Sequence, residues 1–310
     1  MLSNGLVTRG QGIPIPSFPG LSSQNGRVKF RSHLLRPLDP ESPWNRAVLA
    51  LSVVAGIIGA YLTLAQDAPP LLAIEAAGTA FLSWALAREL DPDRQIPALV
   101  VEAIGGAWAL LGFETAILPF VALMMAARLV VETTGRRPLP TDLAGMALLA
   151  TVVSLTPLGW VMGFGLAVAI YVDDRLAEEP SRAALLAALS AAIGSSVVAS
   201  LSGTFPRTLP MVDPLVVAAL GVLALIAVLR EPLEPVSFVD SRTKKFLRRD
   251  RVQAGRALTA ILVFVGVVVS GAIAPAVVPM ALVVAAALAS TEVERLQRAS
   301  PDPGYRGPHV

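Results

Sequence analysis

Cysteine, histidine, aromatic and charged residues are all scarce in this 310-residue chain. Cysteine is absent, which excludes disulfides, thiolate nucleophiles, iron–sulfur clusters and cysteine-ligated zinc. The two histidines, His33 and His309, stand in polar terminal segments, so no apolar segment holds a histidine base or a histidine ligand for haem or a metal. We therefore predict no resident cofactor.

The low charge excludes further classes of protein. Only 15% of the residues are charged, whereas a soluble domain is about 25% charged. The formal net charge is only +2, and the basic residues do not gather on a soluble domain, so no nucleic-acid partner is predicted. Soluble enzymes and disordered proteins are excluded as well. What is abundant is apolar: 54% of the residues are hydrophobic and the mean hydropathy is +0.65.

The apolar residues fall into long runs. About 20 apolar residues cross a hydrocarbon layer of about 30 Å as a helix. Six runs come close to that length: 47–65, 70–87, 96–111, 115–131, 183–201 and 212–229. The sequence therefore predicts an all-α integral membrane protein, with the lipid bilayer as its surroundings.

Two longer runs, 143–172 and 257–290, decide the number of spans. A helix of 34 residues would be about 51 Å long, too long for one span without severe tilt. Pro157 breaks the first run, and Pro275 and Pro279 break the second. Taken as two hairpins, these runs predict a polytopic bundle of about ten transmembrane helices.

The basic residues indicate the orientation. With ten spans, all of the 25 lysines and arginines except Arg207 fall on the side of the N-terminus. Positive charge favours the cytoplasmic side, so both termini are predicted to be cytoplasmic. The richness in arginine and alanine is typical of a GC-rich prokaryotic gene, which indicates a bacterial or archaeal cytoplasmic membrane.

The positions of the apolar runs also divide the chain into segments. Residues 1–45 are proline-rich and lack the apolar core of a signal peptide, so they are predicted to be a disordered cytoplasmic arm. Helices one to eight then occupy 46–229, a basic cytoplasmic loop 230–256, a helical hairpin 257–291 and a cytoplasmic tail 292–310.

The basic loop contains SRTKKFLRRDRV, which we expect to form a short helix. Either the loop only fixes the topology, or its cations contact anionic lipid headgroups or a protein partner. The candidate cations are Lys244, Lys245, Arg248, Arg249 and Arg251.

Charged residues inside apolar runs are functional candidates, because each is expensive in hydrocarbon unless paired or hydrated. Glu102 and Arg128 are each thirteen residues from Thr115, at the turn of their hairpin. Equal spacing predicts equal depth and hence an ion pair that locks two helices. The alternatives are a carboxylate coupled to a proton or substrate, and no contact at all. Glu75 lies near the outer end of its run, where it either reaches the headgroups or lines a vestibule.

Glycines within the runs predict close approach of helices, because small residues let two backbones meet. They include Gly56, Gly59, Gly105, Gly106 and Gly163.

Two acidic clusters stand at inner turns. The first, in RELDPDR, holds Glu89, Asp91 and Asp93, and the second, in DDRLAEE, begins with Asp173 and Asp174. Either they are solvated loop charges, or they hold Mg²⁺ bound to a diphosphate. In position the clusters resemble the aspartate motifs of membrane prenyltransferases of the UbiA superfamily, although the family's asparagine and regular DxxxD spacing are absent. That resemblance implies a Mg²⁺-dependent transferase acting on a lipid-linked substrate.

Three functions are therefore carried forward. Ten helices, short loops and both ends inside resemble the drug/metabolite transporter superfamily in outline, which implies a secondary carrier for a small molecule or lipid. The long basic loop departs from that family. The alternatives are a non-catalytic subunit or assembly factor of a membrane complex, and the transferase.

Overall fold

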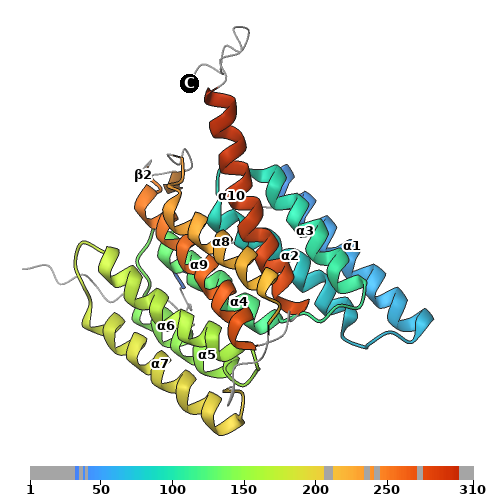
Figure 1. Ribbon diagram of the computed structural model, residues 1–310, viewed down its shortest axis with the longest axis horizontal. Coiled ribbons are helices and arrows are strands. Elements are labelled where there is room, and N and C mark those ends of the chain that lie inside the picture. The colour runs from blue at the N-terminus through green and yellow to red at the C-terminus, as the bar shows by residue number, and fades with distance from the viewer. Residues whose placement is uncertain are drawn as a thin grey trace, which may run out of the picture. The chain divides into compact units, whose positions relative to one another are not determined.

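The computed structural model describes residues 32–34, 38, 41–205, 212–233, 238–240, 245–270 and 275–299. All of these belong to one compact unit, Ser32–Val310. The described part of the chain contains ten α-helices (Figure 1). They are α1 Pro43–Gln66, α2 Leu72–Leu90, α3 Gln95–Leu110, α4 Ile117–Val131, α5 Pro140–Val153, α6 Gly159–Leu176, α7 Arg182–Ser202, α8 Pro214–Leu229, α9 Arg249–Ser270 and α10 Val278–Ala299. The predicted all-α fold of ten helices is confirmed.

Both long apolar runs are divided as expected. α5 ends at Val153 and α6 begins at Gly159, where a Cβ would lie 1.7 Å from the carbonyl oxygen of Val153, so the tight turn requires glycine. The second run divides into α9 and α10, and the 3₁₀ turn Pro275–Val277 leads directly into α10. Proline also opens α1, α5 and α8, where its missing N–H has no helical partner to lose.

The last two helices extend beyond the predicted hairpin of 257–291. α9 begins at Arg249 rather than 257, and α10 continues to Ala299 rather than ending near 291. Residues 245–252, the described part of SRTKKFLRRDRV, form no separate short helix: β1 (Phe238–Asp240) pairs antiparallel with β2 (Lys245–Phe246), and Arg249–Val252 form the start of α9. The helices continue because their charged residues have partners inside the protein, which a search for uncharged runs does not detect.

The predicted disordered arm, 1–45, lies mostly outside the described residues. Where it is described, it lies against the helices. Leu34 is buried, and the backbone N–H of His33 donates to the carboxylate of Asp142 over 3.0 Å. The end of the predicted tail, 300–310, is also outside the described residues.

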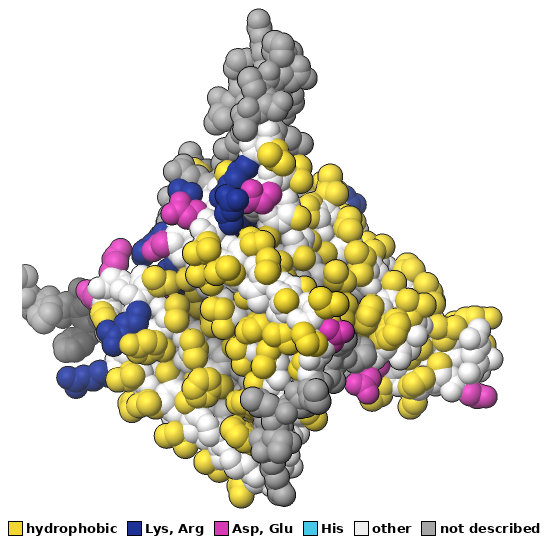
Figure 2. Space-filling model, viewed as in Figure 1, with side chains coloured by type: hydrophobic (Ala, Val, Ile, Leu, Met, Phe, Trp, Pro, Cys, Tyr) yellow, Lys and Arg dark blue, Asp and Glu magenta, His cyan; other side chains and the backbone are white. Residues whose placement is uncertain are grey.

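Three helices, α1, α7 and α9, are long and apolar enough to cross a membrane, and α3, α4, α5 and α8 are shorter apolar helices. Large apolar side chains on the first two are exposed, including Ile57 and Leu64 of α1 and Ile193 and Leu201 of α7. Hydrophobic side chains cover most of the face in Figure 2. Three spans and so much exposed apolar surface indicate a membrane protein.

The helices pack as two groups around a centre. α1, α2 and α3 pack on one another and form the first helix group, and α5, α6 and α7 form the second helix group. The two central helices, α4 and α9, pack against each other and against both α2 and α6. α8 packs on α9, while α10 packs on α2, α3 and α9.

Glycine permits the close contacts inside each group. A Cβ on Gly59 of α1 would lie 2.8 Å from the Cα of Ala73 in α2. One on Gly163 of α6 would lie 2.4 Å from the carbonyl oxygen of Ala150 in α5. These contacts confirm the predicted role of both glycines in close helix packing.

Candidate functional site

Charged side chains from several helices meet at one end of the helices. We call this set the ion-pair layer, and it consists of Glu89, Asp91, Arg94, Arg128, Glu132, Asp173, Arg251, Arg256 and Glu294. They come from the last residues of α2, α4, α6 and α10, from the short turns that follow α2 and α4, and from the first turns of α9. Figure 2 shows acidic and basic side chains together where α10 ends and near β2.

Arg251 joins three helices. Its side chain is 4% exposed, with Nη1 2.6 Å from Oδ1 of Asp173 in α6 and Nε 3.1 Å from Oε2 of Glu132 at the end of α4. It also donates to the carbonyl oxygen of Val130 over 3.1 Å. A carboxylate at a helix C-terminus is unfavourable with the helix dipole, so a buried arginine between two such carboxylates offsets both.

Arg256 lies about one and a half turns further along α9. Its Nε donates to the carbonyl oxygen of Leu90 over 2.7 Å, and its Nη1 donates to Oγ1 of Thr291 over 3.1 Å. Nη2 is 3.8 Å from Oδ1 of Asp91. α9 is thereby fixed to α2 and α10 as well.

Arg94 ties the turn between α2 and α3 to α10. It pairs with Asp91, with Nη1 2.5 Å from Oδ2, and also with Glu294. Burial lowers the pKa of the Arg94 guanidinium, but its hydrogen bonds to Glu294 and Asp91 outweigh this and raise the pKa overall. The hydroxyl of Ser290 donates to the same Asp91 oxygen over 2.6 Å.

The expected pair between Glu102 and Arg128 is wrong. Arg128 lies 2.5 Å from Oε1 of Glu89 through its Nη2, and Thr133 donates to the other oxygen of Glu89. α4 packs on α2 rather than beside Glu102 of α3, so equal depth did not bring the two charges together. Glu89 lies just beyond the apolar run 70–87. The arginine on α4, as a possible partner for this carboxylate, was the signal in the sequence that could have identified the pair.

The acidic clusters are divided among separate partners. Glu89, Asp91 and Asp173 each pair with arginine, and Asp174 accepts from the backbone N–H of Ser181 over 2.6 Å. Asp93 is exposed in the turn after α2. Among the described residues, no three acidic or histidine side chains lie close enough to share a metal ion.

The loop cations also differ from expectation. Arg251 is buried, so the predicted headgroup contact is wrong for this residue. Arg248 is exposed and pairs with Asp250, while Arg249 pairs with Glu231 over 2.7 Å. Lys244 and the side chain of Lys245 lie outside the described residues.

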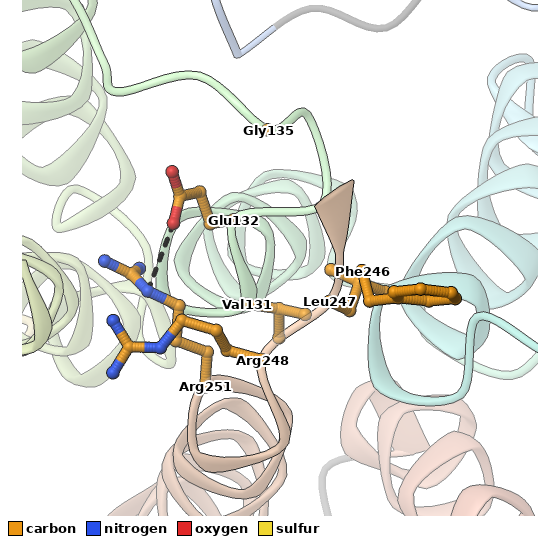
Figure 3. A pocket seen from close by; sticks show the side chains of 7 residues that line it. All are labelled: Val131, Glu132, Gly135, Phe246, Leu247, Arg248 and Arg251. Carbon is orange, nitrogen blue, oxygen red and sulfur yellow. Dashed lines mark ion pairs between the residues drawn. The ribbon is translucent and has the colours of Figure 1, made fainter. Parts of the chain in front are cut away.

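A small pocket opens beside Arg251 (Figure 3). It is lined by Val131, Glu132, Gly135, Phe246, Leu247, Arg248 and Arg251. Figure 3 shows the ion pair between Glu132 and Arg251 at its wall. Because the carboxylate already holds that arginine, the pocket is a poor receptor for an anion.

The second candidate site surrounds Glu102, whose side chain is fully buried. The hydroxyl of Ser52 in α1 donates to its Oε1 over 3.0 Å. Its Oε2 has no hydrogen-bond partner among the described residues. Glu75, by contrast, is partly exposed in the first turn of α2, where a carboxylate complements the helix dipole.

Comparison with protein-family models, curated proteins and solved structures found no match to this chain.

Proposed function

We propose that this is a multi-pass protein of a prokaryotic cytoplasmic membrane, in which all ten helices cross the bilayer and both termini are cytoplasmic. The distribution of lysine and arginine supports this orientation. The ion-pair layer would then lie at the level of the inner headgroups, where its charges are least costly. The shorter helices, such as the 14-residue α5, would be accommodated by local thinning of the bilayer.

We further propose a secondary carrier for a small molecule or lipid. The observation that carries this proposal is the one-sided position of the ion pairs: among the described residues, every ion pair lies at the same end of the helices. In alternating access, a carrier is closed on one side of the membrane at a time. Ion pairs at one end only would hold this protein closed on that side.

The helix arrangement supplies the moving parts. Each helix group is packed tightly through glycine. The two groups are joined through α4 and α9: Arg128 of α4 binds Glu89 of α2, and Arg251 of α9 binds Asp173 of α6 and Glu132 at the end of α4. Exchange of partners within the ion-pair layer would let one helix group move against the other.

The test is exchange of a solute. The protein, purified in nanodiscs, is screened for metabolites and lipids that raise its thermal stability, and each hit is then measured by counterflow in proteoliposomes. We expect saturable exchange that is absent from protein-free liposomes and retained in Glu75→Gln. Folded, reconstituted protein that exchanges none of its stabilising compounds would contradict the carrier.

A second candidate is a non-catalytic subunit or assembly factor of a membrane complex. The exposed apolar faces of α1 and α7 favour it, since their hydrophobic spans are only 22% and 28% buried. Mass spectrometry after gentle extraction into nanodiscs separates the two proposals, because a stoichiometric protein partner supports the subunit. The geometry does not favour the transferase, because three of the carboxylates that would hold Mg²⁺, Glu89, Asp91 and Asp173, are already paired with arginine.

A further inference from the structure

Glu102 lies where three helices meet at their closest. A Cβ on Gly105, less than one turn further along α3, would lie 2.3 Å from Oγ of Ser83 in α2. One on Gly106 would lie 3.2 Å from the Cβ of Ala80 in α2 and 3.3 Å from that of Ala55 in α1. The glycines therefore draw the first helix group together around the carboxyl group and leave it no access to solvent.

Within the described parts of the chain, no cation compensates this carboxyl group. Glu102 has one side-chain hydrogen bond, from Ser52, and forms no ion pair within the described residues. α3 packs on α1, α2 and α10. The charged residues of those helices stand toward the helix ends: Arg46 on α1, Glu75, Arg88 and Glu89 on α2, and Glu292, Glu294, Arg295 and Arg298 on α10.

An ionised carboxylate in such a place is far more costly than a neutral one. An isolated buried charge loses its hydration without replacement, whereas a neutral carboxylic acid loses only a polar group's hydration. One neutral hydroxyl donor on Oε1 does not make up the difference, because Oε2 stays without a partner. The favoured occupant of this site is a proton on the carboxyl group.

We propose that Glu102 is a reversible proton-binding site, and that it carries a proton in the conformation described. A metal cation in its place would need several oxygen ligands, and Oε2 has no polar neighbour within hydrogen-bond distance among the described residues. Deprotonation breaks the O–H bond and passes the proton to water, which can reach the group only when α1 separates from α2 and α3.

α1 is the helix that can separate. Its spanning segment is the least buried of the three long apolar helices, and Gly56 and Gly59 form its contact with α2. Proton release and movement of α1 are therefore linked. This inference rests on the proposed carrier only in naming the proton as its coupling ion, while the proton site itself can be tested without a substrate.

The test is infrared difference spectroscopy of the full chain in an ester-free detergent while the pH is raised. We expect a carbonyl stretching band of a buried, protonated carboxylic acid at low pH that shifts in D₂O and is lost at higher pH. The band is expected to be missing from Glu102→Gln and retained in Glu75→Gln. Thermal unfolding of each variant shows whether it is folded.

The outcomes are distinct. Absence of the band at every pH, or its persistence up to the pH at which the protein unfolds, would overturn the proposal. So would loss of the band when sodium replaces choline at constant pH, since that result indicates a cation site. A band that titrates in a protein without solute exchange supports the proton site and contradicts the carrier. Solute exchange by a protein that lacks the band supports the carrier and contradicts the proton site.

Discussion

Replacement of Arg251 by glutamine is expected to lower the free energy of unfolding by about 3–5 kcal/mol, the usual effect of removing one partner from a buried ion pair. The arginine is 4% exposed and serves both Asp173 and Glu132. Glutamine is too short and uncharged, so two largely buried carboxylates at helix C-termini would lose their common partner. Thermal or denaturant unfolding in detergent measures the effect.

The matched control is Arg248→Gln on the same segment. Arg248 has a side chain that is 43% exposed; it pairs with the exposed Asp250 and donates to the carbonyl oxygen of Leu176 over 3.1 Å. Exposed pairs of this kind contribute about 0–1 kcal/mol, so the variant should unfold nearly as the wild type does. Equal stability of the two variants would contradict a structural role for the ion-pair layer.

The second large effect is expected for Gly163→Val in α6. Its Cβ would lie 2.4 Å from the carbonyl oxygen of Ala150, 2.5 Å from Oγ of Ser154 and 2.7 Å from Oγ of Ser195. α5 and α7 would both have to move, and overpacking of this kind costs about 1–3 kcal/mol or more. A lower unfolding temperature and lower yield after purification are the expected results.

Gly145→Ala in α5 is the control for this change. A Cβ there would have no neighbour within 4 Å, and alanine is the better helix former by about 1 kcal/mol. We expect unchanged or slightly higher stability. Full stability of Gly163→Val would mean that the second helix group is not packed as described.

The sequence was sufficient to predict the helices but not the partners of their charged residues. Apolar runs and three prolines predicted ten helices, because the length of a span and the breaking effect of proline are local properties. Headgroup contact was one of the two roles offered for Arg251, and Arg128 was expected to meet Glu102. Those assignments depend on α4 packing against α2 and on α9 reaching α6, and neither contact follows from spacing along the chain.

The helix ends show the same limit. α9 and α10 continue through charged residues that an uncharged-run criterion excludes. Arg251 and Arg256 tolerate burial only because acids or carbonyl oxygens from other helices reach them. The sequence placed Glu102 in an apolar run, but neither its burial nor its single hydrogen bond from Ser52 was predicted.

The most direct measurement is the sidedness of single cysteines, since the chain has no cysteine of its own. Gln66→Cys and Glu114→Cys lie at one set of turns, and Arg136→Cys and Glu178→Cys lie at the other; all four positions are exposed. In intact cells, we expect a membrane-impermeant maleimide to label Gln66→Cys and Glu114→Cys, and to label the other two only after permeabilisation. Labelling of all four from one side, or the reverse order, would contradict ten spans with the ion-pair layer in the cytoplasm.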